Sequence, residues 1–232
     1  MAKGRFKSTV WKVWDVLYPI VFFELCLVVS TLVIMIICGM YYGGISTEFV
    51  LRQFPAAAIL INILFYGVSV FVLGKAYKRD NLRFGERNNR WSVGKIIAAA
   101  AIAAAAAIAL NAAILYSPLP DIFPGFNDAA ATSFKGQNPI LLILTMVILG
   151  PIAEELAFRG LTYDRMKRYL GVPWSIVISS LMFGIYHANM IQFIYTSIMG
   201  LLLALYYEKS GSLIVPVIAH MAMNAYAVAS YF

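Results

Sequence analysis

Residues 151–159 read PIAEELAFR and continue, without a break, an apolar run that begins near Pro139. A helix through this run is long enough to cross a bilayer. It carries two adjacent carboxylates, Glu154 and Glu155, followed by Arg159. An ionisable side chain near the bilayer centre costs about 2.5–3.5 kcal/mol on insertion scales, so such residues usually face a protein interior and serve a function. The stretch therefore predicts a buried polar site inside a membrane protein.

The composition of the whole chain is that of a membrane protein. Of its 232 residues, 62% are hydrophobic and 12% are charged, whereas an average globular chain has roughly 25% charged residues. The apolar runs do not alternate as the segments of about ten residues in a β-barrel do. We therefore predict an all-α fold, a polytopic transmembrane helical bundle that forms a single membrane-embedded domain over residues 1–232.

Seven apolar stretches predict about seven membrane spans, and an eighth, half-membrane element is left open. Most stretches approach the roughly 20 residues that a span needs. The fifth and sixth are shorter and are separated only by Asn189 and Met190, which predicts a tight helical hairpin. The last four stretches form a motif-bearing core, residues 139–232. The seven stretches are Tyr18–Tyr42, Pro55–Ala76, Ile96–Tyr116, Pro139–Phe158, Pro173–Ala188, Ile191–Tyr207 and Leu213–Tyr231.

The basic residues predict the orientation in the membrane. With seven crossings, all 18 lysines and arginines except Arg52 and Lys135 fall on one side. The positive-inside rule makes that side cytoplasmic. We therefore expect a multi-pass protein of the cell membrane whose N-terminus, with the basic segment 1–17, is cytoplasmic and whose C-terminus is outside. The net charge of +7 then indicates contact with anionic membrane lipid rather than a nucleic-acid partner.

Three pairs of polar or aromatic residues share a helix face, because residues four apart lie on the same side of an α-helix. Arg159 can hold Glu155 in place, while Glu154 projects about 100° away from Glu155. The Gly150–Pro151 step can kink this helix and open space beside the glutamates. The other two pairs lie on later apolar stretches and are Phe183 with His187 and His220 with Asn224.

These residue types suit the hydrolysis of an amide, which needs a base to activate water and donors to stabilise the developing oxyanion. A buried glutamate beside a histidine suits the first task, and the pair His220 and Asn224 suits the second. A second chemistry stays open, since Glu154, His187 and His220 can also form a three-ligand zinc site with one open position. The chain has no His-Glu-x-x-His motif, and we favour a site without zinc or another cofactor.

Each of these residues also has a purely structural interpretation. Glu155 and Arg159 can form an ion pair at a helix end near the headgroups. A single histidine in a membrane more often bonds a neighbouring helix than catalyses, and Asn224 alone can join two helices. Glu24, in the first stretch, is expected at the interface or paired within the bundle. A site is favoured because the few polar residues gather in the last part of the chain.

The motifs, taken together, resemble a known family. The CPBP family comprises the type II CAAX prenyl proteases and their bacterial homologues and is also called the Abi family. The resemblance covers about the last two fifths of the chain. Each motif alone is weak evidence for the family, whereas three motifs in order on apolar helices are specific to it. The motifs that match are Glu154-Glu155-x-x-x-Arg159, Phe183-x-x-x-His187 and His220-x-x-x-Asn224.

The resemblance implies an intramembrane endopeptidase with a polar cavity that opens toward the cytoplasm, and a peptide or a membrane-anchored protein as its substrate. It implies a glutamic peptidase, a type formerly described as metal-dependent. The implied roles are Glu154 as the base that activates water, His187 as its assistant, His220 and Asn224 as oxyanion donors, and Glu155 as an ordering residue, with Arg159 and Phe183 in support.

Two other functions remain as alternatives. One is a non-catalytic bacteriocin immunity or membrane regulatory protein on the same scaffold, which would need no intact water-activating pair. The other is a small transporter with a Glu/His proton relay, which predicts paired broken helices in two repeated halves. The sequence shows no such repeat, and the complete set of motifs favours the peptidase.

Overall fold

The computed structural model describes residues 2–42, 56–85, 88, 90–123 and 138–229. All regular secondary structure in these ranges is helical. Five helical stretches in these ranges are long and apolar enough to cross a membrane, and a shorter apolar helix, α11 (Ile214–Ala229), follows them. The expected multi-pass helical bundle is therefore confirmed, while the side of the membrane on which each terminus lies stays a prediction.

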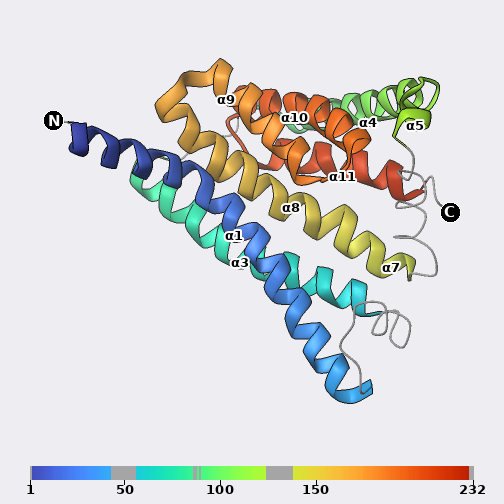
Figure 1. The fold of residues 1–232 in the computed structure, drawn as a ribbon. Helices are drawn as coiled ribbons and strands as arrows, with labels where there is room; N and C mark the ends of the chain where they lie inside the picture. Colours follow the sequence, from blue (N-terminus) through green and yellow to red (C-terminus); the bar gives the residue numbers. More distant parts are fainter. Residues whose placement is uncertain (1, 43–55, 86–87, 89, 124–137, 230–232) are drawn as a thin grey trace.

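A long central helical stretch organises the bundle and carries PIAEELAFR (Figure 1). Asn138 caps its start, where its side-chain oxygen accepts a hydrogen bond from the Ile140 amide at 2.9 Å, and the chain bends sharply at Gly171 (φ 75°, ψ 174°). The fourth and fifth predicted stretches are therefore one helical stretch that bends at Gly171. Its parts are α7 (Pro139–Leu142), the π-helix η1 (Ile143–Leu149), α8 (Gly150–Glu155), the π-helix η2 (Leu156–Tyr163) and α9 (Asp164–Tyr186).

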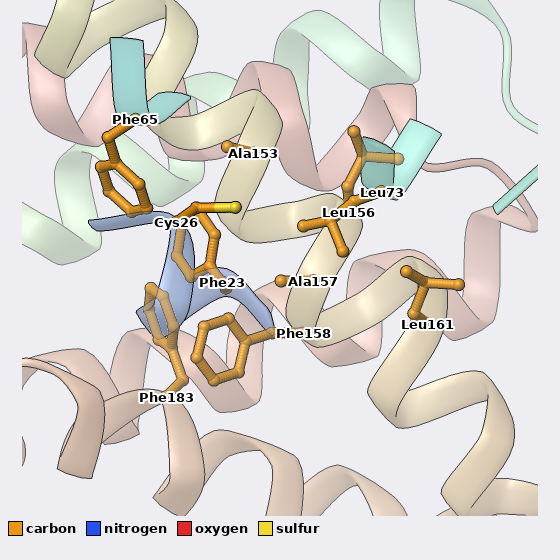
Figure 2. Packing of buried hydrophobic residues seen from close by; sticks show 10 residues of the cluster. All are labelled: Phe23, Cys26, Phe65, Leu73, Ala153, Leu156, Ala157, Phe158, Leu161 and Phe183. Atoms are coloured by element: carbon orange, nitrogen blue, oxygen red, sulfur yellow. The ribbon is translucent and has the colours of Figure 1, made fainter. Parts of the chain in front are cut away.

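Two N-terminal helices cover one side of this central stretch. α1 (Ala2–Tyr42) and α3 (Ala57–Phe84) run side by side, and both contact η2 (Figure 1). Every residue of η2 is buried, including the polar residues Arg159 and Thr162 among its apolar and aromatic neighbours. Ala157, Phe158 and Leu161 of η2 belong to a hydrophobic cluster that also includes Phe23 of α1 (Figure 2).

The alanine-rich helix lies on the other side of the bundle, against the C-terminal helices (Figure 1). α4 (Val93–Leu115) contacts α11 and α10 (Met190–Ser210), and a short helix, α5 (Leu119–Ile122), follows it. Ala99, Ala103 and Ala107 recur every four residues and are the buried face of α4. Small side chains at this spacing let helices approach closely, so α4 packs against α10 and α11 along its alanine face while most of the helix stays exposed.

The predicted hairpin between the fifth and sixth stretches is present as α9 and α10. Asn189 caps α10, because its side-chain oxygen accepts hydrogen bonds from the amides of Ile191 (2.9 Å) and Gln192 (3.2 Å). The two helices meet closely at Gly184, where an added Cβ would collide with the Ser197 hydroxyl and lie 2.8 Å from the Phe193 carbonyl oxygen. Glycine is therefore required at this crossing.

Replacing Gly184 with alanine is expected to destabilise the protein by about 1–3 kcal/mol, because the new methyl group forces α9 and α10 apart. The measurement is the free energy of unfolding in mixed micelles, titrated with a denaturing detergent. Gly74→Ala is the matched control, since nothing lies within 4 Å of its added Cβ and alanine favours a helix by up to about 1 kcal/mol. Equal stability of the two variants would contradict the close crossing.

Buried and half-buried charges tie the helices together at the end that is predicted to face the cytoplasm. The Arg165 guanidinium donates to Asp80 Oδ2 at 2.7 Å, to the Asp15 carbonyl oxygen at 2.9 Å and to the Tyr18 hydroxyl at 2.5 Å. These bonds join α9 to α3 and α1. Residues 161–170 thus continue the central helical stretch, and their inner face is packed against α1 and α3.

Candidate active site

Glu155 and Arg159 form the ion pair that their spacing predicts, at the boundary between α8 and η2. Arg159 Nη1 donates to Glu155 Oε1 at 2.9 Å, and both side chains are 0% exposed. Arg159 Nη2 donates to the Gly200 carbonyl oxygen of α10 at 3.2 Å, and its guanidinium lies 4.4 Å from the centre of the Phe183 ring. The pair therefore lies inside the bundle and not at a headgroup-exposed helix end.

His220 of α11 lies between the two glutamates. Its Nδ1 is 3.0 Å from Glu155 Oε1, and its Nε2 is 3.7 Å from Glu154 Oε2. An ionised carboxylate can only accept hydrogen bonds, so Nδ1 is the donor to Glu155 and Nε2 faces Glu154. Glu155 thus receives donors from both Arg159 and His220, and it fixes the orientation of the imidazole against the second carboxylate.

Asn224, one turn after His220, is held by the irregular part of the central stretch. Its Nδ2 donates to the Met146 carbonyl oxygen in η1 at 2.8 Å. In a π-helix this oxygen would pair with the amide five residues later, which is that of Pro151 and has no hydrogen. The proline therefore leaves a partly buried acceptor that Asn224 satisfies, and one amide hydrogen of Asn224 remains for another partner.

Phe183, near the end of α9, and His187, directly after that helix, lie beside His220. The Phe183 ring meets the His187 and His220 rings edge to face, with centroid distances of 4.9 and 5.7 Å. His187 Nδ1 lies 2.8 Å from the Phe183 carbonyl oxygen, which can only accept. Nδ1 is therefore the protonated nitrogen of neutral His187, and Nε2 carries the free lone pair.

Two tyrosines near Glu154 were not among the residues expected at the site. Tyr66 of α3 and Tyr186 of α9 both lie within electrostatic reach of the Glu154 carboxylate. The Tyr66 ring packs against Gly150, where an added Cβ would lie 3.3 Å from Cζ. Tyr186 precedes His187 directly in the sequence, whereas no pattern in the sequence of α3 distinguishes Tyr66.

The expected zinc alternative requires Glu154, His187 and His220 to converge on one point. Among the residues that the structure describes, no three His, Cys, Asp or Glu side chains are placed to hold a metal ion. Nδ1 of each histidine is bonded, to Phe183 and to Glu155 respectively, and such bonds are also typical of histidines that bind a metal through the other ring nitrogen. The three side chains are therefore not placed as a zinc site in this arrangement, and the choice between the two chemistries stays a prediction.

Comparisons with known proteins agree with the motifs. Residues 136–226 match the family model described as "Type II CAAX prenyl endopeptidase Rce1-like". The chain is 33% identical over 192 residues to a Bacillus subtilis protein named "Putative membrane peptidase YdiL", a match that covers 81% of this chain and 77% of that protein. It is 27% identical over 165 residues to an "Uncharacterized 24.3 kDa protein" of Escherichia coli, covering 69% and 73% respectively.

No solved structure matches the chain significantly. The relationship therefore rests on sequence, and the matched part of the chain contains all three motifs that the bundle brings together around Glu154 and Glu155. The chain belongs to the CPBP family of membrane proteases, which includes the type II CAAX prenyl endopeptidases.

Proposed function

We propose that this chain is an intramembrane endopeptidase of the glutamic type, which hydrolyses a peptide bond of a peptide or membrane-anchored protein. The observation that carries the proposal is the placement of Glu154. The residue is 6% exposed, and its carboxylate faces an imidazole that a second carboxylate holds in position. A buried carboxylate with a positioned imidazole and nearby amide donors is the arrangement needed to activate water and to stabilise an oxyanion.

In the proposed mechanism, Glu154 removes a proton from a water molecule, which attacks the scissile carbonyl carbon. His187 assists by accepting a hydrogen bond from the same water at Nε2, the nitrogen that its bond to Phe183 leaves free. The proton held by Glu154 then passes to the amine that leaves when the C–N bond breaks. No step requires a metal ion.

The oxyanion is proposed to form beside α11. Asn224 contributes the amide hydrogen that its bond to Met146 leaves free. His220 contributes a hydrogen at Nε2, while Nδ1 stays bonded to Glu155. Glu155 and Arg159 act as positioning residues in this scheme, because they contact His220 and Gly200 rather than the substrate.

The proposed function predicts proteolysis that does not depend on a metal ion. The purified protein in liposomes should cleave members of a library of peptides anchored by a transmembrane helix, with and without a farnesylated C-terminal CAAX box, and mass spectrometry should locate each cut. The cleavage rate should stay within about two-fold in excess EDTA or 1,10-phenanthroline. Elemental analysis should find no stoichiometric zinc, whereas loss of activity in chelator and its return with zinc would overturn the metal-free mechanism.

A further inference from the structure

A polar cavity lies away from the glutamates, where α1, the end of α3 and the start of α9 meet. It has a volume of about 720 Å³ and is lined by five basic side chains and two carboxylates, together with aromatic residues that include Trp11 and Trp14. Tryptophan is typical of the membrane–water interface. The cavity lies at the end of the bundle that is predicted to face the cytoplasm, the side on which anionic lipid headgroups attract basic residues.

Both carboxylates of this cavity already have basic partners. Asp80 is bound by Arg165 at 2.7 Å, and Asp15 by Arg168 at 3.3 Å. Lys12 and Arg83 are exposed and have no carboxylate partner among the described residues. The cavity therefore keeps an excess of positive charge that its own acids do not neutralise, and the chemical group that this charge complements is an anion.

A second cavity adjoins the first and has a different character. It has a volume of about 560 Å³, follows the groove between α1 and α9, and shares Lys12, Arg168 and Tyr169 with the polar cavity. Beyond these shared residues its lining is almost entirely apolar and includes Val13 and Ile178. The charged cavity and the apolar groove therefore meet at these three shared residues, and a free phosphate or a soluble peptide would fill only the first of the two.

We infer that the two cavities form one binding site for an anionic glycerophospholipid. The phosphate lies near Lys12, Arg83 and Arg168, and an acyl chain follows the groove between α1 and α9. Basic pockets between membrane helices on the cytoplasmic side are suited to such headgroups, and the apolar groove supplies the second half of an amphiphile site. A bound lipid would join α1 to the helix that continues from η2, and so stabilise the scaffold of the active site.

Native mass spectrometry with phosphatidylglycerol and phosphatidylcholine of identical acyl chains tests this site. We expect the wild-type protein to retain one phosphatidylglycerol preferentially and its thermal midpoint to rise with that lipid by several degrees. Glycerol 3-phosphate, which carries the headgroup charge without chains, should not reproduce the shift. Equal retention of the two lipids, or an equal shift with glycerol 3-phosphate, would overturn the inference.

Paired variants locate the binding to these cavities. Lys12→Gln with Arg83→Gln should weaken phosphatidylglycerol retention by about ten-fold or more. Lys95→Gln with Lys209→Gln is the matched control, because it removes two exposed positive charges of the same predicted side from outside both cavities. Val13→Trp keeps every charge but fills the groove, and should also weaken retention. Unchanged retention in both test variants, with elution as folded protein, would place the lipid elsewhere.

Discussion

Glu154→Gln is expected to lower the rate of peptide cleavage by about 10²–10⁴-fold, the contribution typical of a general base. Glutamine has nearly the same shape as glutamate but cannot accept the proton of the attacking water. The substitution also removes a buried charge that faces His220 at 3.7 Å, so the fold should be retained. The measurement is the single-turnover cleavage rate in liposomes with the membrane-anchored peptide library.

Glu24→Gln is the matched control for this prediction. Glu24 is half-buried on α1, within electrostatic reach of Tyr186, and it is therefore a second carboxylate in an apolar helix near the same region. Its neutralisation should change cleavage by less than about three-fold, because among the described residues no hydrogen bond or ion pair joins it to a group that the mechanism uses. Full activity of Glu154→Gln would remove the glutamate base from the mechanism. It would mean that another group of the site activates the water.

The helices could be predicted from the sequence because the length and apolarity of a membrane span are local properties. The third stretch was predicted as Ile96–Tyr116 and is observed as Val93–Leu115. The fourth and fifth stretches were predicted separately and are one helical stretch with a bend at Gly171. The hydrophobicity of two apolar runs does not indicate whether the polar segment between them is a loop or a packed helix. Here the segment is a packed helix, and its Arg165 is buried by partners from α1 and α3.

The site could be predicted in part, because the sequence allows only contacts within one helix to be predicted. The bond between Glu155 and Arg159 follows from their spacing on one helix. Contacts across helices, such as His220 with Glu155 or Asn224 with Met146, join residues 65 and 78 positions apart. Spacing within a helix gives no information on them, because they depend on how helices rotate and slide against each other. The proline explains the second contact only once the π-helical geometry of η1 is known.

Arg159→Met is expected to destabilise the protein by about 3–5 kcal/mol, the cost of breaking a buried ion pair from one side. The substitution leaves the Glu155 carboxylate, which is 0% exposed, without its cation. It also leaves the Gly200 carbonyl oxygen without the hydrogen bond from Nη2. The measurement is the free energy of unfolding in mixed micelles. Lys209→Met, at an exposed position of α10, is the control and should stay within about 0.5 kcal/mol of the wild type.

A second pair of variants separates the structural role of Arg159 from its proposed role in positioning. Combining Arg159→Met with Glu155→Leu removes both charges, and it should recover part of the lost stability, since a buried pair can often be replaced by apolar residues at little cost. Cleavage should not recover, because His220 then loses the acceptor at 3.0 Å that orients its imidazole toward Glu154. Recovery of cleavage together with stability would show that the pair supports only the fold, and that His220 finds its working orientation without Glu155.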